Sequence, residues 1–478
     1  MRDKLLKLEK TSRLLEPTPE KRKAVRDKVV QYGEDFLNKI ETSKAFEANS
    51  DKGLGLLDHP IGGKPLSITQ ALNLVKKNVD FPALNPASGG HLGYIPGGGI
   101  YYSSLGDYLT AITNRYAAIF YASPGAVRME NMLIDWMANL VGYPKNTVGN
   151  LTSGGSIANL IAICTARDAK NITSKNLPKS VIYMTAQTHH SLNKAFRIAG
   201  LNECLIRYIE MDSHCRMDAK DLRTQILADK KKKLNPFLVV GSAGTTDTGA
   251  IDPLEDIGNI AKRHKLWYHI DAAYGGFFIL TREGKRKLKG LDKSDSLVID
   301  PHKGLFLPYG VGTVLVKNKK HLNATHHYLA NYMQDTLSAM EEPSPADLSP
   351  ELTKHFRGLR MWLPLQLLGI KPFKACLEEK LLLAKYFYKE VRKLGFETGT
   401  KPELSVVTFR YKLKHGDQDK FNQKLLEFIK EDGRTFVSST NLDGKFTMRF
   451  ACLSFRTHLS TVDSLLTVLK KGVKKLEE

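Results

Sequence analysis

The feature that most constrains the fold is a series of short β-branched segments that alternate with helical segments between about residue 150 and residue 320. Strands that alternate with helices predict an α/β domain whose central sheet is mostly parallel. In such sheets, ligands bind beyond the carboxyl ends of the strands. The residues that directly follow each apolar segment are therefore the first candidates for chemistry. The expected strands are Val181–Met184, Phe237–Gly241, Trp267–Ile270, Ser296–Ile299 and Gly312–Val316.

The parts of the chain on either side of this region have different patterns. Before it, we expect helices at Lys23–Thr42 and through Ser104–Leu140, where apolar residues recur at three- and four-residue steps. Between them, the glycine-rich passage His91–Gly99 is expected to turn closely and to contain no regular structure. After about residue 365, we expect a small α+β domain. Its long helix, its alternating strand and its final amphipathic helix are predicted at Phe373–Leu394, Phe446–Leu453 and Thr461–Lys475.

Length and charge exclude several classes of protein. A chain of 478 residues can form two or three domains with a large buried core. The net charge of +21 is compatible with nucleic-acid binding. However, the excess is spread along the chain and accompanies no nucleic-acid-binding motif, which favours a lysine-rich solvated surface. No stretch approaches the roughly 18–20 continuous apolar residues that span a bilayer, and the first ten residues lack the apolar block of a secretory signal. We therefore expect no membrane association.

The cysteines indicate neither a metal site nor a disulfide framework. They are five in number, widely spaced, and form no C-x-x-C pair. Isolated cysteines in apolar surroundings are usually reduced core residues, which favours a cytoplasmic location. The five are Cys164, Cys204, Cys215, Cys376 and Cys452.

Two charged residues end predicted strands. Lys303 follows Ser296–Ile299 in the sequence Asp-Pro-His-Lys, and a lysine partly withdrawn from water is a good amine nucleophile for a carbonyl. Asp271 ends the strand at Trp267–Ile270, and Ala273 leaves room beside it for a flat ring. A buried carboxylate needs a cation, which a protonated pyridine nitrogen would supply. Taken singly, Lys303 is better explained as a surface lysine, and Asp271 can also be explained as a helix or turn cap.

Three further segments at strand ends are polar. The sequence Asn150–Asn159 contains Ser-Gly-Gly-Ser at the start of an apolar helix, which can bind a phosphate or simply cap the helix. His189 lies in Gln187–Ser191, where an imidazole can stack on a cofactor ring and exchange protons near neutral pH. Thr246 can donate a hydrogen bond to a phenolate oxygen. A phosphate site, a stacking histidine, an aspartate and a lysine together are the contacts that pyridoxal 5′-phosphate (PLP) requires.

These motifs resemble those of the group II PLP-dependent decarboxylases, which include aromatic-amino-acid, tyrosine, histidine and glutamate decarboxylases. The family belongs to the aspartate-aminotransferase superfamily, fold type I. The resemblance covers about residues 50 to 478. It rests on His91–Gly99, Ser123-Pro124 with Glu130, Thr152–Asn159, His189, Gly244–Asp252, His269–Ala273, Asp300–Lys303 and Phe356–Trp362.

The resemblance assigns a role to each matching residue. It implies that Lys303 is the Schiff-base lysine, that Asp271 pairs with the pyridine nitrogen, and that His189 rather than His190 stacks on the ring. The expected catalytic residues are these three and Tyr332. The remaining contacts that it implies with the cofactor are made by Gly155, Ser156, Thr246, Ala273, Asp300 and His302, of which Asp300 occupies a position that is often asparagine. Gly97 and Arg449 are expected near the substrate, although Arg449 is equally explained as a surface residue.

The resemblance implies decarboxylation of an aromatic or related L-amino acid by a homodimer whose loops share the active sites. Two departures leave other reactions open. Gly304 stands where relatives commonly carry an aromatic residue, and Met340–His355 lacks the tyrosine that many relatives place on a mobile loop. Tyr332 is the nearest upstream candidate for that tyrosine. An aldehyde synthase or a carbon–carbon lyase is therefore the alternative, with a basic nucleic-acid-binding protein on an inactive scaffold as a more distant one.

The expected domain organisation has three parts. Residues 1–95 form a helical segment that is too open to stand alone, so we expect it to pack on a partner subunit. Residues 96–365 form the large PLP-binding α/β domain, and residues 366–478 form the small α+β domain.

Overall fold

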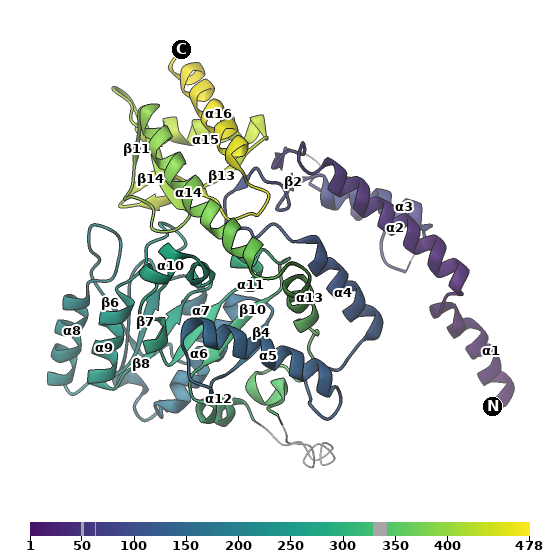
Figure 1. Ribbon diagram of the computed structural model, residues 1–478, viewed down its shortest axis with the longest axis horizontal. Helices are drawn as coiled ribbons and strands as arrows, with labels where there is room; N and C mark the ends of the chain where they lie inside the picture. The colour runs from purple at the N-terminus through teal and green to yellow at the C-terminus, as the bar shows by residue number, and fades with distance from the viewer. Residues whose placement is uncertain (49–51, 63, 328–341) are drawn as a thin grey trace.

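A computed structural model describes residues 1–48, 52–62, 64–327 and 342–478. Two sheets organise the body of the molecule, and a helical arm at the amino terminus extends away from it (Figure 1). The chain therefore has the α/β architecture that the alternating segments predict.

The large sheet has seven strands in the order β4-β10-β9-β8-β7-β5-β6. All of them run parallel to one another except β10, which pairs antiparallel with both β4 and β9. The carboxyl ends of the parallel strands consequently meet at one edge, as expected. The strands are β4 (Val148–Thr152), β5 (Ser180–Met184), β6 (Leu205–Tyr208), β7 (Asn235–Ser242), β8 (Trp267–Asp271), β9 (Ser296–Ile299) and β10 (Gly312–Val316).

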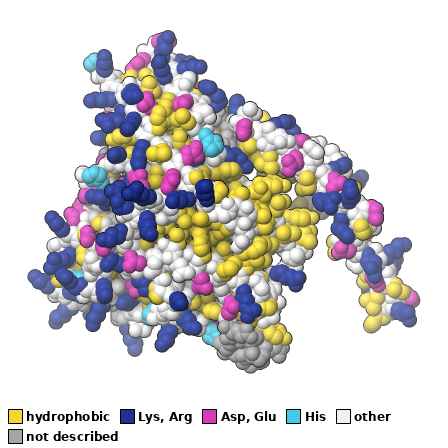
Figure 2. Space-filling model, viewed as in Figure 1, with side chains coloured by type: hydrophobic (Ala, Val, Ile, Leu, Met, Phe, Trp, Pro, Cys, Tyr) yellow, Lys and Arg dark blue, Asp and Glu magenta, His cyan; other side chains and the backbone are white. Residues whose placement is uncertain are grey.

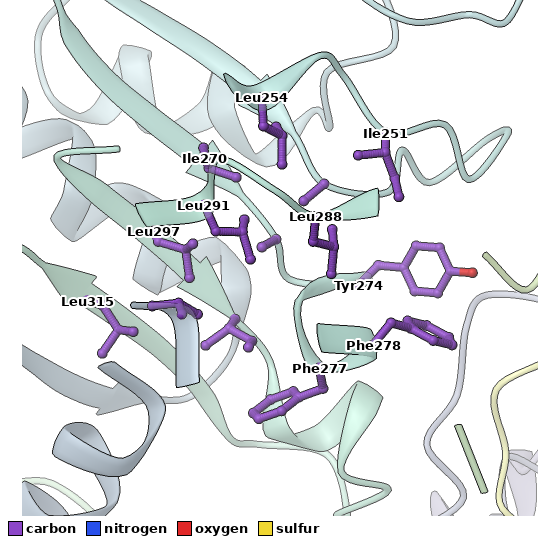
Figure 3. Packing of buried hydrophobic residues seen from close by; sticks show 14 of the residues in the cluster. Ile251, Leu254, Ile270, Tyr274, Phe277, Phe278, Leu288, Leu291, Leu297 and Leu315 are labelled. Carbon is purple, nitrogen blue, oxygen red and sulfur yellow. The ribbon is translucent and has the colours of Figure 1, made fainter. Parts of the chain in front are cut away.

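Helices cover both faces of this sheet because successive strand residues point to opposite sides. Ile182 and Val298 pack with α6, α7 and α12 on one face, whereas Tyr183 and Leu297 pack with α5, α8 and α9 on the other. Figure 3 shows part of the second core, where side chains of β8, β9 and β10 meet Phe277 and Phe278 of a 3₁₀ helix. The covering helices are α5 (Pro124–Val141), α6 (Gly155–Ala169), α7 (Ser191–Ile198), α8 (Ala219–Lys231), α9 (Leu254–His264) and α12 (Lys319–His326). Two shorter helices follow strands β8 and β9, namely α10 (Arg282–Lys287) and α11 (Pro301–Gly304).

The small domain is a five-stranded sheet packed on helices, in the strand order β11-β12-β14-β13-β3. The predicted alternation in β14 is confirmed: Met448 and Phe450 enter the core of this domain, and Ala451 packs instead against the large domain. Its strands are β3 (His91–Leu92), β11 (Phe396–Thr398), β12 (Val406–Tyr411), β13 (Phe436–Leu442) and β14 (Lys445–Ala451). Its helices are α14 (Lys371–Lys393), α15 (Gln418–Asp432) and α16 (Leu459–Glu477), and α13 (Gly358–Leu368) precedes them.

Two sequence predictions about the region before the large sheet were wrong. The single helical pattern through Ser104–Leu140 is two helices, α4 (Tyr101–Thr113) and α5. Asn114 adopts a left-handed conformation that ends α4, and Pro124 begins α5 with the fixed φ that suits a first helical turn. The glycine-rich passage also contains regular structure, because β3 pairs in parallel with β13.

The amino-terminal arm makes few contacts with the body of its own chain. It consists of α1 (Arg2–Ser12), α2 (Pro19–Lys39) and α3 (Ile68–Val75), and no residue of these helices is buried. The short strands β1 (Phe46–Glu47) and β2 (Ala83–Leu84) pair beside it. In the described part of the chain, no helix has the length and apolar character needed to cross a membrane.

Candidate active site

A cavity of about 270 Å³ lies at the carboxyl edge of the large sheet. Five strand ends supply its lining: those of β4, β5, β7, β8 and β9. The structure brings together at this cavity every residue that the sequence assigned to the cofactor. These are Gly155, Ser156, His189, Thr246, Asp271, Ala273, Asp300, His302 and Lys303.

Lys303 lies on α11, the short helix that follows β9. Its Nζ is 3.1 Å from Oδ2 of Asp300, whose side chain is 1% exposed. The Lys303 side chain itself is 26% exposed, so the amine faces the cavity and not bulk water. A buried carboxylate at this distance holds the amine at the sheet edge.

Asp271 ends β8 and is almost completely buried. It accepts hydrogen bonds from Nδ2 of Asn159 and from the backbone N–H of Ala273, both at 3.1 Å. Within residues 1–48, 52–62, 64–327 and 342–478, no salt bridge joins Asp271 to a basic side chain. A carboxylate in this position is costly to bury without a cation. The cavity beside it is therefore suited to a positively charged ring.

The turn between β4 and α6 forms a backbone cradle. Gly155 is required there, because a Cβ atom would lie 2.8 Å from Oδ2 of Asp300 and 3.3 Å from the Cβ of Ala273. The turn and Ser156 stand at the amino end of a fifteen-residue helix, where free N–H groups and the helix dipole favour an anion. His302 lies beside this turn, since a Cβ on Gly154 would be 3.5 Å from its Cε1, and its Nδ1 donates to the carbonyl oxygen of Val311 at 2.5 Å. Its other nitrogen, Nε2, is consequently the one available to the cavity.

His189 is fixed from one side by Ser191. Its Nδ1 is 2.8 Å from the hydroxyl oxygen of Ser191 and accepts from the backbone N–H of that residue at 3.2 Å. Burial lowers the pKa of His189, and the charges of His190 and Lys303 lower it further, whereas Asp271 and Asp300 oppose this effect. The imidazole is therefore mostly neutral at neutral pH.

The residues expected near the substrate have other positions. Arg449 is 3% exposed and does not line the cavity; it donates to the backbone carbonyl oxygens of Thr246 and Asp247, so it supports the turn that carries Thr246. Gly97 does not line the cavity either. A Cβ on it would lie 2.4 Å from the carbonyl oxygen of His302, so it packs against the backbone of α11. Tyr332 lies outside the described residues.

Several residues of the cavity received no role from sequence reasoning, and Asn159 and Ser191 are the two among them that contact Asp271 and His189. Both were present in the polar segments that it singled out. Asn159 follows Gly155 by four residues, so it lies on the same side of α6 as the cradle. That spacing was the available signal. The partners of the two side chains come from distant parts of the chain, so the sequence does not reveal them.

Comparison with known proteins identifies the family. Residues 88–412 match the model of the pyridoxal-dependent decarboxylase conserved domain. An aromatic-L-amino-acid decarboxylase of Bacillus atrophaeus is 31% identical over 452 residues, which cover 93% of each chain. The chain belongs to the pyridoxal-dependent decarboxylase family.

Solved structures of this fold agree with the architecture. Oryza sativa TDC with PLP and tryptamine superposes with a TM-score of 0.91 at 23% identity, covering 97% of this chain and 99% of the other. Rhodiola rosea 4-hydroxyphenylacetaldehyde synthase superposes with a TM-score of 0.88 at 23% identity, covering 96% and 99%. Both superpositions support fold type I.

The cavity fits the cofactor of a pyridoxal-dependent decarboxylase. Asp271 would pair with the protonated pyridine nitrogen, which is the cation that its buried carboxylate lacks among the described residues. The cradle at Gly155 and Ser156, with His302 beside it, would hold the phosphate. Lys303 would meet the aldehyde. The cradle, the carboxylate of Asp271 and the amine of Lys303 thus match the phosphate, the pyridine nitrogen and the aldehyde of PLP.

Proposed function

We propose that this decarboxylase acts on an aromatic L-amino acid and releases the corresponding amine and CO₂. One observation carries the proposal. Lys303, Asp271 and His189 line one cavity in a chain that is 31% identical, over almost its whole length, to an aromatic-L-amino-acid decarboxylase. That relative's name supports the substrate class.

Lys303, Asp271 and His189 each have a separate role in the proposed reaction. When bound, PLP supplies an aldehyde carbon for amines and a conjugated ring that accepts the electron pair left by departing CO₂. Lys303 would present its amine to the aldehyde, and the negative charge of Asp271 would pair with the ring nitrogen, which favours that electron flow. His189 would hold a proton within the cavity for the carbon that loses CO₂.

An aldehyde synthase is the second candidate. It is supported by the similar fold of the Rhodiola rosea synthase and by the absence of tyrosine from residues 342–355. The balanced reaction consumes an amino acid, O₂ and water, and it releases an aldehyde, CO₂, ammonia and hydrogen peroxide. A nucleic-acid-binding role on an inactive scaffold has less support, because Lys303, Asp271 and His189 are all present at the cavity.

The experiment that tests this function offers the purified enzyme, loaded with PLP, each of the twenty amino acids. Released CO₂, amine, aldehyde, ammonia and peroxide are measured together. We expect an aromatic amino acid to give CO₂ and amine in equal amounts, without ammonia or peroxide. Ammonia and peroxide in step with CO₂ would instead identify the aldehyde synthase, and aldehyde without CO₂ would identify a carbon–carbon lyase. Failure of every amino acid to react would contradict the proposal.

We also propose that two chains form a homodimer with shared active sites. The face of α4 carries exposed apolar side chains, and Figure 2 shows apolar side chains gathered between the body and the arm. An exposed patch of this kind is typical of an interface. In this arrangement the helical arm within residues 1–95 packs on the partner, whereas His91 and Leu92 of that segment stay with the small-domain sheet of their own chain as β3. Residues 96–365 bind PLP, and residues 366–478 form the rest of the small domain. The exposed large apolar side chains of α4 are Tyr101, Tyr102, Leu105, Tyr108, Leu109 and Ile112.

A cytoplasmic location is the final part of the proposal. All five cysteines are free thiols. Free buried thiols are typical of reducing compartments. Fractionation of cells that express the tagged protein would test this location.

A further inference from the structure

A buried amide joins the two functional sides of the cavity. Asn159, on α6, is 1% exposed, and its Nδ2 lies 3.1 Å from Oδ2 of Asp271 and 3.1 Å from Oγ of Ser191. Its Oδ1 lies 2.9 Å from Nε2 of His269. The side chain therefore contacts Asp271 directly and reaches His189 through Ser191.

The charge of Asp271 sets the orientation of this amide. If the amide were reversed, its oxygen would face the carboxylate oxygen of Asp271 at hydrogen-bond distance, which is repulsive. The Nδ2 group must therefore face Asp271, and Oδ1 must face His269. It follows that Nε2 of His269 carries a proton.

The far end of the network agrees with this assignment. Trp267 can only donate, and its Nε1 donates to Oγ of Ser296 at 2.9 Å. The hydroxyl of Ser296 is then free to donate to Nδ1 of His269, also at 2.9 Å. Burial lowers the pKa of His269, so its ring is neutral with one proton on Nε2. His269 thus adds no positive charge beside Asp271. The cation that pairs with this carboxylate is then left for the cofactor to supply.

The same reasoning fixes the proton on His189. The backbone N–H of Ser191 can only donate, and it points at Nδ1 of His189. Nδ1 is therefore an acceptor. Since the neutral ring carries one proton, that proton is on Nε2, the nitrogen left for the cavity.

We propose that Asn159 and Ser191 are positioning residues that hold His189 in the tautomer protonated on Nε2 and couple it, through one amide, to the carboxylate of Asp271. The inference rests on the proposed function, since it concerns the same site. It assigns His189 the role of hydrogen-bond donor to the reacting groups. It also predicts that both sides of the cofactor depend on Asn159, whereas only the His189 side depends on Ser191.

The tautomer is measured directly by ¹⁵N NMR of histidine-labelled enzyme loaded with PLP, with the His189 signal identified by its loss in His189→Gln. We expect a proton on Nε2 and none on Nδ1. A proton on Nδ1 in the wild-type enzyme would overturn the proposal. This readout does not depend on activity.

Variants of Ser191 test the coupling to His189. Ser191→Ala should lower kcat about 10- to 100-fold, because a misplaced catalytic group costs this much, while KM and PLP affinity stay close to wild type. Ser191→Thr keeps the hydroxyl and should restore most of the rate. Thr165→Val is the matched control: it removes another buried, hydrogen-bonded hydroxyl near the far end of α6, outside the cavity. Equal effects of Ser191→Ala and Thr165→Val would contradict the proposal.

Variants of Asn159 test the second branch. Asn159→Ala should lower kcat as Ser191→Ala does and also weaken PLP binding about tenfold, because Asp271 loses a charged hydrogen bond. The double variant should be little slower than Asn159→Ala, since both changes break one network. Fully additive losses of kcat would contradict the coupling. If Asn159→Ala does not fold, the Ser191 variants and the NMR measurement still decide the question.

Failure of this inference is distinguishable from failure of the proposed function. If the wild-type enzyme decarboxylates an amino acid but Ser191→Ala is unimpaired, only the positioning role is lost. If the wild-type enzyme neither binds PLP nor reacts, the proposed function itself fails.

Discussion

At the scale of single residues, the site depends on a carboxylate whose cation is not among the described residues. Asp271→Asn preserves shape and removes the charge. We expect kcat to fall about 100-fold, as when one preorganised electrostatic contact to the reacting system is lost. PLP affinity, measured by equilibrium dialysis, should fall as well.

The control for this variant is Asp443→Asn. Asp443 is exposed and has a left-handed backbone that asparagine adopts readily. Asp443→Asn should leave kcat and PLP affinity unchanged. An Asp271→Asn enzyme with wild-type kcat would show that the ring nitrogen does not need this charge.

A second single residue, His91, should control stability in acid. Its ring lies against Tyr94 and Phe436, and neither of its nitrogens has a hydrogen-bond partner among the described residues. Burial lowers its pKa to about 4. The unfolded chain, with a histidine pKa near 6.5, therefore binds the proton more tightly than the folded chain. The contribution of His91 to the free energy of unfolding is fully present above about pH 6.5. About 3 kcal/mol of it is lost as the pH falls toward 4.

His91→Phe should remove this contribution. Between pH 7 and pH 4.5, the free energy of unfolding in urea should fall less for His91→Phe than for the wild-type protein. Some dependence should persist, because burial also lowers the pKa of His269. The exposed His415, replaced by alanine, should leave the wild-type dependence intact. Identical pH dependence for wild type and His91→Phe would contradict this account.

At the scale of elements, a buried ion pair anchors the chain that enters α13. Lys354 is fully buried, and its Nζ lies 2.7 Å from Oε2 of Glu130 on α5 and 2.7 Å from Oδ1 of Asn150 on β4. The other carboxylate oxygen of Glu130 accepts from the backbone N–H groups of Arg357 and Gly358 at 3.0 Å. One carboxylate thus joins α5, β4 and the start of α13.

Lys354→Met should therefore be strongly destabilising. It leaves Glu130 charged, buried and without its cation, which costs about 3–5 kcal/mol of unfolding free energy. Lys393→Met is the matched control, because Lys393 pairs with Glu390 at 2.7 Å but is 69% exposed. That loss should stay below about 1 kcal/mol. Urea unfolding of both variants measures the difference. Equal losses of unfolding free energy would contradict the stabilising role of the buried Lys354–Glu130 pair.

Sequence patterns predicted the elements that are locally determined. The parallel strands β5, β7, β8 and β9 were found because each is a short apolar run followed by polar residues. The strand β4 was not named, since Gly149 and Asn150 interrupt its apolar pattern, and β3 has two residues within a glycine-rich passage. The residues that we propose hold the cofactor could be singled out because they follow strand ends, and the structure brings them to one cavity. The network through Asn159 was not, because its partners meet only when α6 packs against β8 and the start of α7.

At the scale of the whole molecule, charged and apolar side chains are distributed differently over the surface. Lysine and arginine side chains are dispersed over the visible face, whereas apolar side chains gather near α4 (Figure 2). The three helices of the amino-terminal arm, α1, α2 and α3, have no buried residue in a single chain. In the proposed dimer, the apolar side chains of α4 and the helices of the arm both pack against the partner subunit.

Ile112→Asp should therefore separate the proposed dimer into single chains. Ile112 is 68% exposed on α4, and a charge there would have to lose its water at the interface. Ile198→Asp is the matched control, because Ile198 is also 68% exposed but lies on α7. Light scattering coupled to gel filtration measures the mass. A wild-type protein with the mass of one chain, or an unchanged mass for Ile112→Asp, would contradict this interface.

The central claim is that the amine of Lys303 meets the aldehyde of PLP, and one measurement tests it most directly. The enzyme is incubated with PLP, reduced with borohydride, digested and analysed by mass spectrometry, beside Lys303→Ala and Lys317→Ala. We predict a pyridoxyl group on the peptide that contains Lys303 in the wild-type and Lys317→Ala proteins, and none at this position in Lys303→Ala. Attachment at scattered surface lysines, with the Lys303 peptide unmodified, would contradict the account.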